Sequence, residues 1–279
     1  MTVLMAGCGD VGTEAGLRFA AQGHRVVGWR RSPDRLPSPI EGIAADLTGE
    51  LPRVPTGTEV VVFAPAAGER SVRAYRQVYL DGLARVLDAL ERDAVTPSRI
   101  IVVSSTAVYA DTEGTWVDEA TPADPPTETS LVLREAEELL AARAPQGVVL
   151  RLAGIYGPGR TRLVDQVRAG SAGTGRRRFT NRIHRDDAAA AIVHLATGVT
   201  DPAPVYNGVD RDSALLGDVL DFLADRLGVD HPSSDGEGPA PTGKRISGEL
   251  LRSTGLAFTY PSYREGYTAV LAGEGTRHP

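Results

Sequence analysis

Three glycines near the start of the chain, Gly7, Gly9 and Gly12, have the GxGxxG spacing and directly follow a short apolar run, Val3–Ala6. In this pattern the first glycine permits a tight turn, and the second lets backbone N–H groups reach a pyrophosphate. The third allows close packing of a helix whose N-terminus faces the anion. We therefore predict a dinucleotide-binding loop, with a bare turn as the alternative. The predicted loop residues are Gly7, Cys8, Gly9, Asp10, Val11 and Gly12.

Cys8 lies inside this loop and has two interpretations. A thiol near a helix N-terminus can have a lowered pKa, and its oxidation would then block cofactor binding. The interpretation that we favour is that Cys8 is simply a small residue tolerated between two glycines.

The next apolar run ends in a basic segment that contains Arg30, Arg31 and Ser32. An NAD site usually has an acidic residue at this point, about 20 residues beyond the glycines, to bind the ribose 2′-OH. Guanidinium groups and a hydroxyl instead suit a 2′-phosphate, so the sequence favours NADP(H) over NAD(H). The alternative is a solvated basic loop.

Two further pairs of residues complete the expected cofactor site. Asp46 and Leu47 follow a third expected strand, where the carboxylate could accept a bond from the adenine amino group or cap a helix. Ala64 and Pro65 follow directly after the apolar run Val60–Phe63.

The composition excludes several classes of function. The chain has 279 residues, 30 basic and 36 acidic side chains and a net charge of −6, which argues against a nucleic-acid partner. No apolar stretch reaches the roughly 18 to 20 residues that cross a bilayer, and no basic segment precedes the first apolar run. A single cysteine and five histidines without close helical spacing argue against a metal site. We expect a metal-free cytoplasmic protein with no membrane partner.

Short apolar runs alternate with helix-like segments, which is typical of βαβ units in an α/β fold with a doubly wound parallel sheet. The expected strands are Val3–Ala6, Arg25–Trp29, Val60–Phe63, Ile100–Val103, Val148–Leu150 and Val205–Asn207. The expected helices are Val11–Ala21, Val72–Glu91, Thr129–Ala142, Asp186–Ala196 and Leu215–Leu227. The segment Asp230–Gly243 is rich in Pro, Gly, Ser and Asp, which indicates a surface loop.

Several motifs are spread over nearly the whole chain. They are GCGDVG at 7–12, YRQVYLDGLARVLDAL at 75–90, VVSSTAVY at 102–109, LRLAGIYGPGR at 150–160, NRIHRDD at 181–187, VYNGVD at 205–210 and GKRISGELL at 243–251. Together they resemble the extended and atypical short-chain dehydrogenase/reductases, the NAD-dependent epimerase/dehydratase superfamily, and within it the YeeZ-like branch.

The resemblance implies a domain organisation. A Rossmann-type NAD(P)-binding domain would comprise residues 1–152 and 182–210, and a smaller substrate-side region would comprise residues 153–181 and 211–279. The helices at 72–91 and 129–142 match those of a four-helix dimer interface in many relatives, so the analogy implies a homodimer.

The resemblance also implies roles for the hydroxyls that end the expected strand Ile100–Val103. Ser105 matches the residue that orients the substrate carbonyl, with Ser104 toward the cofactor and Thr106 toward the substrate. The plainer alternative for these hydroxyls is strand termination and local backbone hydrogen bonding.

The superfamily uses a tyrosine and a lysine in a YxxxK motif, and this chain departs from that pattern. Thr129 stands at the tyrosine position and Leu133 at the lysine position. Lys244, the single lysine of the chain, has Ala240 four residues before it, so the motif occurs nowhere. The usual proton relay is therefore absent, as it is in the YeeZ-like branch.

Carbonyl chemistry still needs a proton donor within about 2.6 to 3.2 Å of the reacting oxygen. Tyr156 and His184 are our candidates, and their alternatives are a turn aromatic and a structural histidine. Arg160 and Arg182 could hold an anionic substrate through paired hydrogen bonds, although Arg182 could instead bridge to a helix end.

Two functions follow from these observations. The first is an NADP(H)-binding oxidoreductase or epimerase-type enzyme that acts on a small polar carbonyl or hydroxyl compound with a non-standard proton donor. The second is a non-catalytic dinucleotide-binding sensor or regulatory protein. Retention of the SST cluster and of the YGPG and IHRDD segments favours the enzyme.

Overall fold

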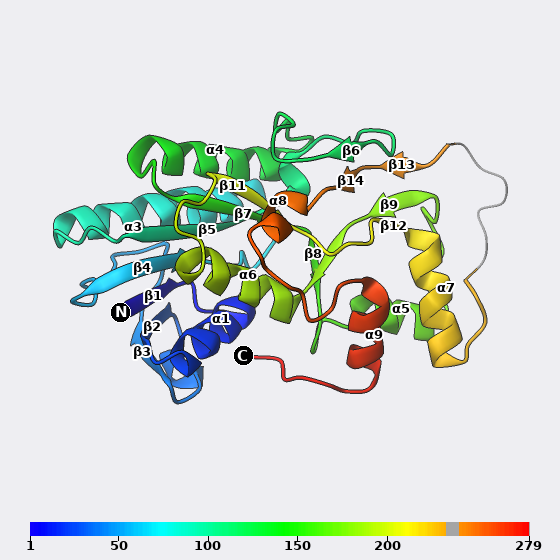
Figure 1. Cartoon of the computed structure of the whole chain (residues 1–279), viewed down its shortest axis with the longest axis horizontal. Helices are drawn as coiled ribbons and strands as arrows, with labels where there is room; N and C mark the ends of the chain where they lie inside the picture. The colour runs from blue at the N-terminus through cyan, green and yellow to red at the C-terminus, as the bar shows by residue number, and fades with distance from the viewer. Residues whose placement is uncertain (233–239, 279) are drawn as a thin grey trace.

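The computed structural model describes residues 1–232 and 240–278, and its centre is a seven-stranded parallel sheet (Figure 1). The strand order is β11-β7-β5-β4-β1-β2-β3. These strands are β1 (Thr2–Ala6), β2 (Arg25–Arg30), β3 (Ile40–Ala44), β4 (Thr58–Phe63), β5 (Arg99–Ser105), β7 (Val148–Leu152) and β11 (Val205–Gly208). The order changes direction between β1 and β4, and ligands of open α/β sheets bind at such a switch point. The predicted α/β fold with a doubly wound parallel sheet is confirmed.

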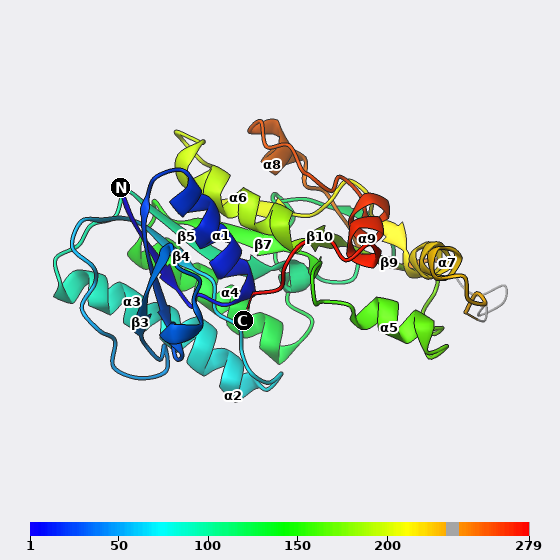
Figure 2. The ribbon, with the colours of Figure 1, turned by 90° about the horizontal axis from the view of Figure 1, so that it is seen from below.

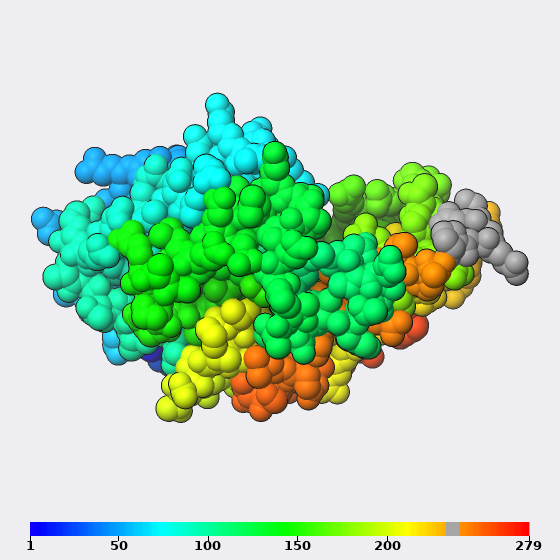
Figure 3. Space-filling model, turned by 90° about the horizontal axis from the view of Figure 1, so that it is seen from above, coloured from blue at the N-terminus to red at the C-terminus, as the bar shows by residue number. Residues whose placement is uncertain are grey.

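Helices cover both faces of this sheet, which explains why its central strands are apolar along their length (Figure 2). On one face, α1 (Asp10–Ala21) packs against α6 (Arg185–Thr197). On the other face, α3 (Asp81–Arg92) lies beside α4 (Glu128–Arg143). The outer surface of α4 is open to view in Figure 3. Each face of the sheet packs against its own apolar core. Together the two cores fix the positions of the strands and of their carboxyl ends.

The expected helix Val72–Glu91 contains a feature that its periodicity does not reveal. The segment consists of α2 (Val72–Tyr75), a π-helical turn over Arg76–Leu80, and α3. Its first turn is capped by Ser71, whose hydroxyl accepts a bond of 3.2 Å from the backbone N–H of Ala74. A π-helical turn inside a helix changes which side chains share a face, and such turns are frequent at functional sites.

A third apolar core, separate from the two beside the sheet, lies in the second half of the chain. It is formed mainly by α5 (Arg162–Arg168), α7 (Leu216–Leu227) and α9 (Tyr263–Leu271). A small sheet contains β9 (Arg178–Thr180), β12 (Ala214–Leu215) and β13 (Thr242–Gly243). The division of the chain into two domains stays a prediction.

Two parallel strands, β8 (Gly154–Tyr156) and β10 (Arg182–His184), pair with each other outside the central sheet. The remaining short elements are η1 (Pro33–Arg35), η3 (Thr106–Val108), β6 (Trp116–Val117), β14 (Arg245–Ile246) and α8 (Glu249–Ser253). The expected loop Asp230–Gly243 lies partly outside the described residues, and its last two residues form β13.

Candidate functional site

The glycine loop is held in place by backbone bonds to the end of β2. The N–H groups of Gly7 and Cys8 both donate to the carbonyl of Trp29, at 3.1 and 3.0 Å. Gly7 has a φ of +84°, and a Cβ there would lie 2.7 Å from the Cα of Pro65. A Cβ on Gly9 would meet no atom within 4 Å. The loop therefore needs its first glycine for the turn and leaves open space above its second.

A cavity of about 600 Å³ opens directly beside this loop, at the carboxyl ends of β1 to β4. It is lined by Gly7, Cys8, Gly9, Trp29, Arg30, Arg31, Ser32, Arg35, Ala45, Asp46, Leu47, Thr48, Pro65, Ala66, Gly68 and Val78. Among the predicted cofactor residues, Asp10, Val11, Gly12, Ala64 and Ser104 are not in this lining. The sequence interpretation missed Arg35, Thr48, Ala66, Gly68 and Val78, although Arg35 lies within the same basic segment that drew attention to Arg30.

Positive charge dominates the wall of this cavity beyond β2. Arg30, Arg31 and Arg35 line it together with the hydroxyl-bearing Ser32. Asp46 accepts bonds from the backbone and hydroxyl of Thr48, at 2.9 and 2.8 Å, and these bonds lower the pKa of its carboxyl. Its carboxylate closes a turn and no helix begins there, so the helix-cap alternative is wrong. The donor set fits a dinucleotide that carries a 2′-phosphate.

Cys8 is almost completely buried, with its Sγ 3.8 Å from the hydroxyl oxygen of Thr13. Burial raises the pKa of the thiol to about 11, and this outweighs the lowering effects of the Thr13 hydrogen bond and of the Arg30 charge. At neutral pH the thiol is protonated, which supports the small-residue interpretation over the reactive one.

The three hydroxyls at the end of β5 have different surroundings. Ser104 is buried and donates a bond of 2.5 Å to Glu137 of α4, so its hydroxyl faces away from the cavity. Ser105 is half-buried and caps η3, because its hydroxyl accepts a bond of 3.1 Å from the backbone N–H of Ala107. Thr106 is buried. Ser105 is therefore the hydroxyl that remains for a substrate, and we leave Ser104 out of the proposed cofactor site.

Glu137 belongs to a buried polar network that the sequence interpretation missed. Its carboxylate forms an ion pair of 2.6 Å with Arg151 of β7, and both side chains are less than 10% exposed. Arg151 also donates at 2.8 Å to the hydroxyl of Tyr109, which donates at 3.1 Å to the amide oxygen of Asn207. The network ties α4 to the ends of β7 and β11.

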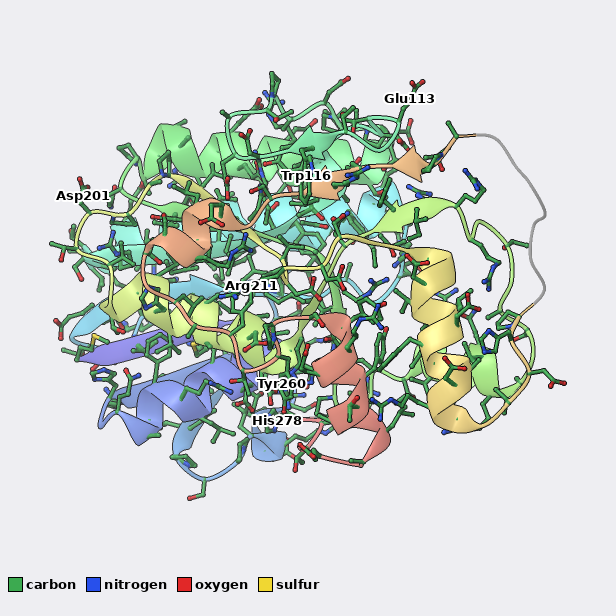
Figure 4. The ribbon with its side chains drawn as sticks, turned by 45° about the vertical axis from the view of Figure 1, so that its right-hand side comes forward. Glu113, Trp116, Asp201, Arg211, Tyr260 and His278 are labelled. Atoms are coloured by element: carbon green, nitrogen blue, oxygen red, sulfur yellow. The ribbon has the colours of Figure 1, made fainter. Side chains whose placement is uncertain are left out.

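Tyr156 and His184, our two candidates for the missing acid, are both buried. The Tyr156 hydroxyl donates to the carbonyl of Ser262 at 3.3 Å, and burial raises the pKa of the phenol far above its usual value. The Nδ1 of His184 accepts from the N–H of Asp186 at 3.2 Å and caps α6, and burial lowers its pKa to about 4. Its ring packs 3.9 Å from the ring of Tyr260, labelled in Figure 4. The geometry favours the structural alternative for both residues.

The predicted substrate arginines are engaged inside the protein. Arg160 forms an ion pair of 2.7 Å with Asp10, which also pairs with Arg185 at 3.0 Å. Asp10 additionally accepts the backbone N–H of His278 at 3.2 Å, and Figure 4 labels His278 close to the start of α1. Arg182 is buried and donates to the hydroxyl of Thr180 at 2.6 Å. Asp10 thus joins the glycine loop to the second half of the chain.

A second cavity of about 750 Å³ is lined by Arg160, the ion-pair partner of Asp10. Its lining includes four arginines, namely Arg70, Arg160, Arg162 and Arg277. Arg70 belongs to the loop after β4, whose residue Gly68 lines the first cavity. The two cavities therefore adjoin the same loop, and the second one offers an electropositive, polar surface.

Within the described ranges, no helix is both long and apolar enough to span a bilayer. In those same ranges, no group of three or more His, Cys, Asp or Glu side chains is arranged so that it could hold a metal ion.

The whole length of the chain is similar to known proteins. Protein YeeZ from Escherichia coli (strain K12) is 28% identical over 276 residues, which cover 93% of this chain and 96% of YeeZ. A candidate NAD-dependent epimerase/dehydratase from Methylobacillus flagellatus is 35% identical, with a TM-score of 0.81 and 97% of each chain covered. The human epimerase family protein SDR39U1, solved with NADPH, is 20% identical, with a TM-score of 0.76 and coverage of 98% and 99%.

Other neighbours share the fold while holding a different dinucleotide. The UDP-glucuronic acid 4-epimerase from Bacillus cereus, solved with NAD, is 19% identical, with a TM-score of 0.76 and coverage of 95% and 96%.

A family model described as NAD(P)H-binding matches residues 7–198, which is more than half of the chain. The predicted resemblance is confirmed, and the chain belongs to the NAD(P)H-binding family, as a homologue of YeeZ among the NAD-dependent epimerase/dehydratases.

Proposed function

We propose that this protein is an NADP(H)-dependent oxidoreductase or epimerase-type enzyme that acts on a small polar carbonyl or hydroxyl compound. The observation that carries the proposal is the charge pattern at the end of β2, where Arg30, Arg31 and Arg35 line the cavity together with Ser32. A 2′-phosphate is a dianion that such a group of donors stabilises, whereas the 2′-OH of NAD(H) usually needs a carboxylate there. The solved neighbours hold NADPH in one case and NAD in others, so the preference rests on these residues of the chain itself.

The path of the cofactor follows from the order of the strands. With its adenosine at the ends of β2 and β3 and its diphosphate over the glycine loop of β1, the dinucleotide extends toward β4 and β5. When bound, it supplies or accepts a hydride at that end. Ser105 ends β5, is half-buried and donates its own hydroxyl proton to no described residue, so it is suited to orient a substrate oxygen there.

The second cavity supports a substrate that carries a carboxylate or phosphate. Arg70, from the loop after β4, and Arg162, from the start of α5, both line it, and neither forms an ion pair with any described residue. Arginine binds planar anionic groups through paired, charge-assisted hydrogen bonds. These two side chains therefore replace Arg160 and Arg182 as the proposed anion-binding residues.

A titration with NADPH and NADH side by side, followed by nicotinamide fluorescence, tests the cofactor proposal. We expect NADPH to bind more tightly, and the double variant Arg30→Ala with Arg31→Ala to lose at least about tenfold in NADPH affinity, because charge-assisted bonds are lost. Affinity for NADH should change little. Arg25→Ala, at the opposite end of the same strand, is the matched control and should leave both affinities unchanged. Equal loss of NADH and NADPH binding would contradict the 2′-phosphate interpretation.

The non-catalytic sensor remains the second candidate, because Tyr156 and His184 are buried and YxxxK is absent. The two functions differ in one observable property. An enzyme oxidises bound NADPH with a member of a carbonyl panel, whereas a sensor binds NADPH without turnover. Failure to bind either cofactor would contradict both.

A further inference from the structure

The place that the missing YxxxK motif leaves on α4 is filled by apolar and aromatic side chains. Leu133, at the lysine position, is only 6% exposed. It belongs to a small apolar cluster against which Tyr75 and Tyr79 pack from the neighbouring helical segment. Thr129, at the tyrosine position, bonds to Thr127 at the start of α4. No group on α4 replaces the lost phenol, but two phenols lie beside it on the adjacent helix.

Tyr79 lies on the π-helical turn and reaches the loop that lines the cofactor cavity. Its hydroxyl accepts a bond of 3.4 Å from the backbone N–H of Ala67. The residues on either side of that N–H, Ala66 and Gly68, both line the cavity, and so does Val78, the neighbour of Tyr79. The Tyr79 hydroxyl is therefore at the edge of the cavity, on the loop that follows β4.

The hydrogen-bonding capacity of this hydroxyl is only half used. Tyr109 and Tyr156 donate their protons to Asn207 and to the Ser262 carbonyl, but the Tyr79 hydroxyl donates to no residue that the structure describes. A tyrosine hydroxyl can accept and donate hydrogen bonds, so the proton of Tyr79 is available to an acceptor outside the described residues. An available O–H group beside a ligand cavity points to an acceptor on a ligand.

The strand order places this hydroxyl at the reactive end of the dinucleotide. The adenosine end lies at β2 and β3, and the sheet continues from β1 to β4 and then β5. Tyr79 contacts the loop after β4, and its ring packs in the cluster that contains Val108, three residues beyond Ser105. Tyr79 therefore contacts the segment that follows β4, Ser105 ends β5, and these two strands are neighbours in the sheet.

We propose that Tyr79, which lies on the π-helical turn, is the catalytic acid of this protein and takes the place of the α4 tyrosine of the superfamily. The inference rests on the proposed NADP(H)-dependent function. In the reducing direction, the hydride adds to the carbonyl carbon while the Tyr79 O–H bond breaks and a new O–H bond forms on the substrate oxygen. The phenolate left on the protein then takes a proton from water and leaves hydroxide. With NADPH converted to NADP⁺ by loss of the hydride, atoms and charge balance.

Burial raises the pKa of the Tyr79 phenol, so it carries its proton at neutral pH and is a weaker acid than an exposed phenol. Its suitability for this step therefore rests on its position. The ring of Tyr75 packs at 5.0 Å and 56° against the ring of Tyr79, which fixes its orientation. Tyr75 lies four residues earlier in the same helical segment, and its hydroxyl makes no hydrogen bond to Ala67 or to any other described residue.

Nitration by tetranitromethane, read by peptide mass spectrometry, tests contact between Tyr79 and the cofactor without a known substrate. Saturating NADP⁺ should reduce nitration of Tyr79 at least about fivefold, because Val78 beside it and the loop that it contacts line the cofactor cavity. Tyr260 should be unchanged, because it packs on His184 and neither it nor its neighbours in the sequence line either cavity. Binding of NADPH is measured in parallel by fluorescence. If NADPH binds while Tyr79 is nitrated equally with and without NADP⁺, the proposal is overturned. If NADPH does not bind, the proposed function itself fails.

A kinetic comparison tests the proton transfer. With any carbonyl compound that supports NADPH oxidation, Tyr79→Phe should lower kcat about 10²- to 10⁴-fold, the range expected for loss of an acid. KM for the compound and NADPH affinity should stay within about threefold. Tyr75→Phe is the matched control and should retain kcat within about threefold. A Tyr79→Phe protein with unchanged kcat, or a Tyr75→Phe protein with an equal loss, would refute the assignment.

Discussion

The buried ion pair between Glu137 and Arg151 allows a quantitative test of what holds the site together. The substitution Glu137→Gln keeps the shape of the side chain and removes its charge. In the native protein the carboxylate accepts bonds from the Arg151 guanidinium at 3.1, 3.2 and 2.6 Å and from the Ser104 hydroxyl at 2.5 Å. The amide can accept only part of this set, and the guanidinium stays buried without a counter-charge.

The expected cost follows from the geometry. Both side chains are less than 10% exposed, so solvent cannot replace the lost partner. Breaking a buried pair by removing one charge costs about 3–5 kcal/mol. Because small proteins are stable by only about 5–15 kcal/mol, this single change would consume a large share of the unfolding free energy.

Glu135 is the matched control, since it lies on the same helix two residues earlier. It pairs with Arg76 at 2.9 Å, but its side chain and that of Arg76 are 30% and 46% exposed. Glu135→Gln should cost less than about 1 kcal/mol, as for other surface pairs. Urea unfolding followed by tryptophan fluorescence measures both variants. A cost below about 1 kcal/mol for Glu137→Gln, or equal costs for the two variants, would refute the reasoning.

Two further predictions concern the glycine loop and the buried acid Asp210. Gly7→Ala should lower the unfolding free energy by about 1–3 kcal/mol, because an L side chain at φ +84° is strained and its Cβ meets Pro65 at 2.7 Å. Gly9→Ala should leave the unfolding free energy within about 0.5 kcal/mol of the wild type, since its Cβ enters open space. It should weaken NADPH binding, because that space lies in the cofactor cavity. A larger loss of stability for Gly9→Ala than for Gly7→Ala in urea unfolding, or unchanged NADPH affinity of Gly9→Ala in a fluorescence titration, would contradict this. Burial raises the pKa of Asp210 to about 8, above its usual value near 4, so the folded state holds a proton that the unfolded state releases. The stabilisation of the fold by the protonated Asp210 is full below about pH 4 and is lost as the pH rises through about 8. Between pH 5 and pH 9 the wild type should therefore lose more unfolding free energy than Asp210→Asn. Identical pH profiles for the two proteins would exclude this role.

The sequence was informative wherever a function depends on residues that are close together in the chain. The GxGxxG loop, the basic segment Arg30–Ser32 and the apolar strand runs each lie within a few residues, so the fold class and the adenosine side of the candidate site could be predicted. The absence of YxxxK was equally visible. Family membership, which rests on motifs in fixed order, was also predicted correctly.

Only the tertiary structure decided which polar side chains face solvent and which are buried. Tyr156 and His184 have suitable chemistry for an acid, but packing by α9 and the cap of α6 removes both from the cavity. No sequence pattern around Tyr79 marks it as a candidate acid. That role depends on its place in a π-helical turn, on its contact with the loop after β4 and on the apolar cluster that it shares with Leu133 of α4. Periodicity reports which face of an element is buried, whereas the partner of a hydroxyl or a guanidinium is fixed by contacts between segments far apart in the chain. For that reason the sequence determined the framework and the cofactor loop, and the folded structure determined the candidate acid.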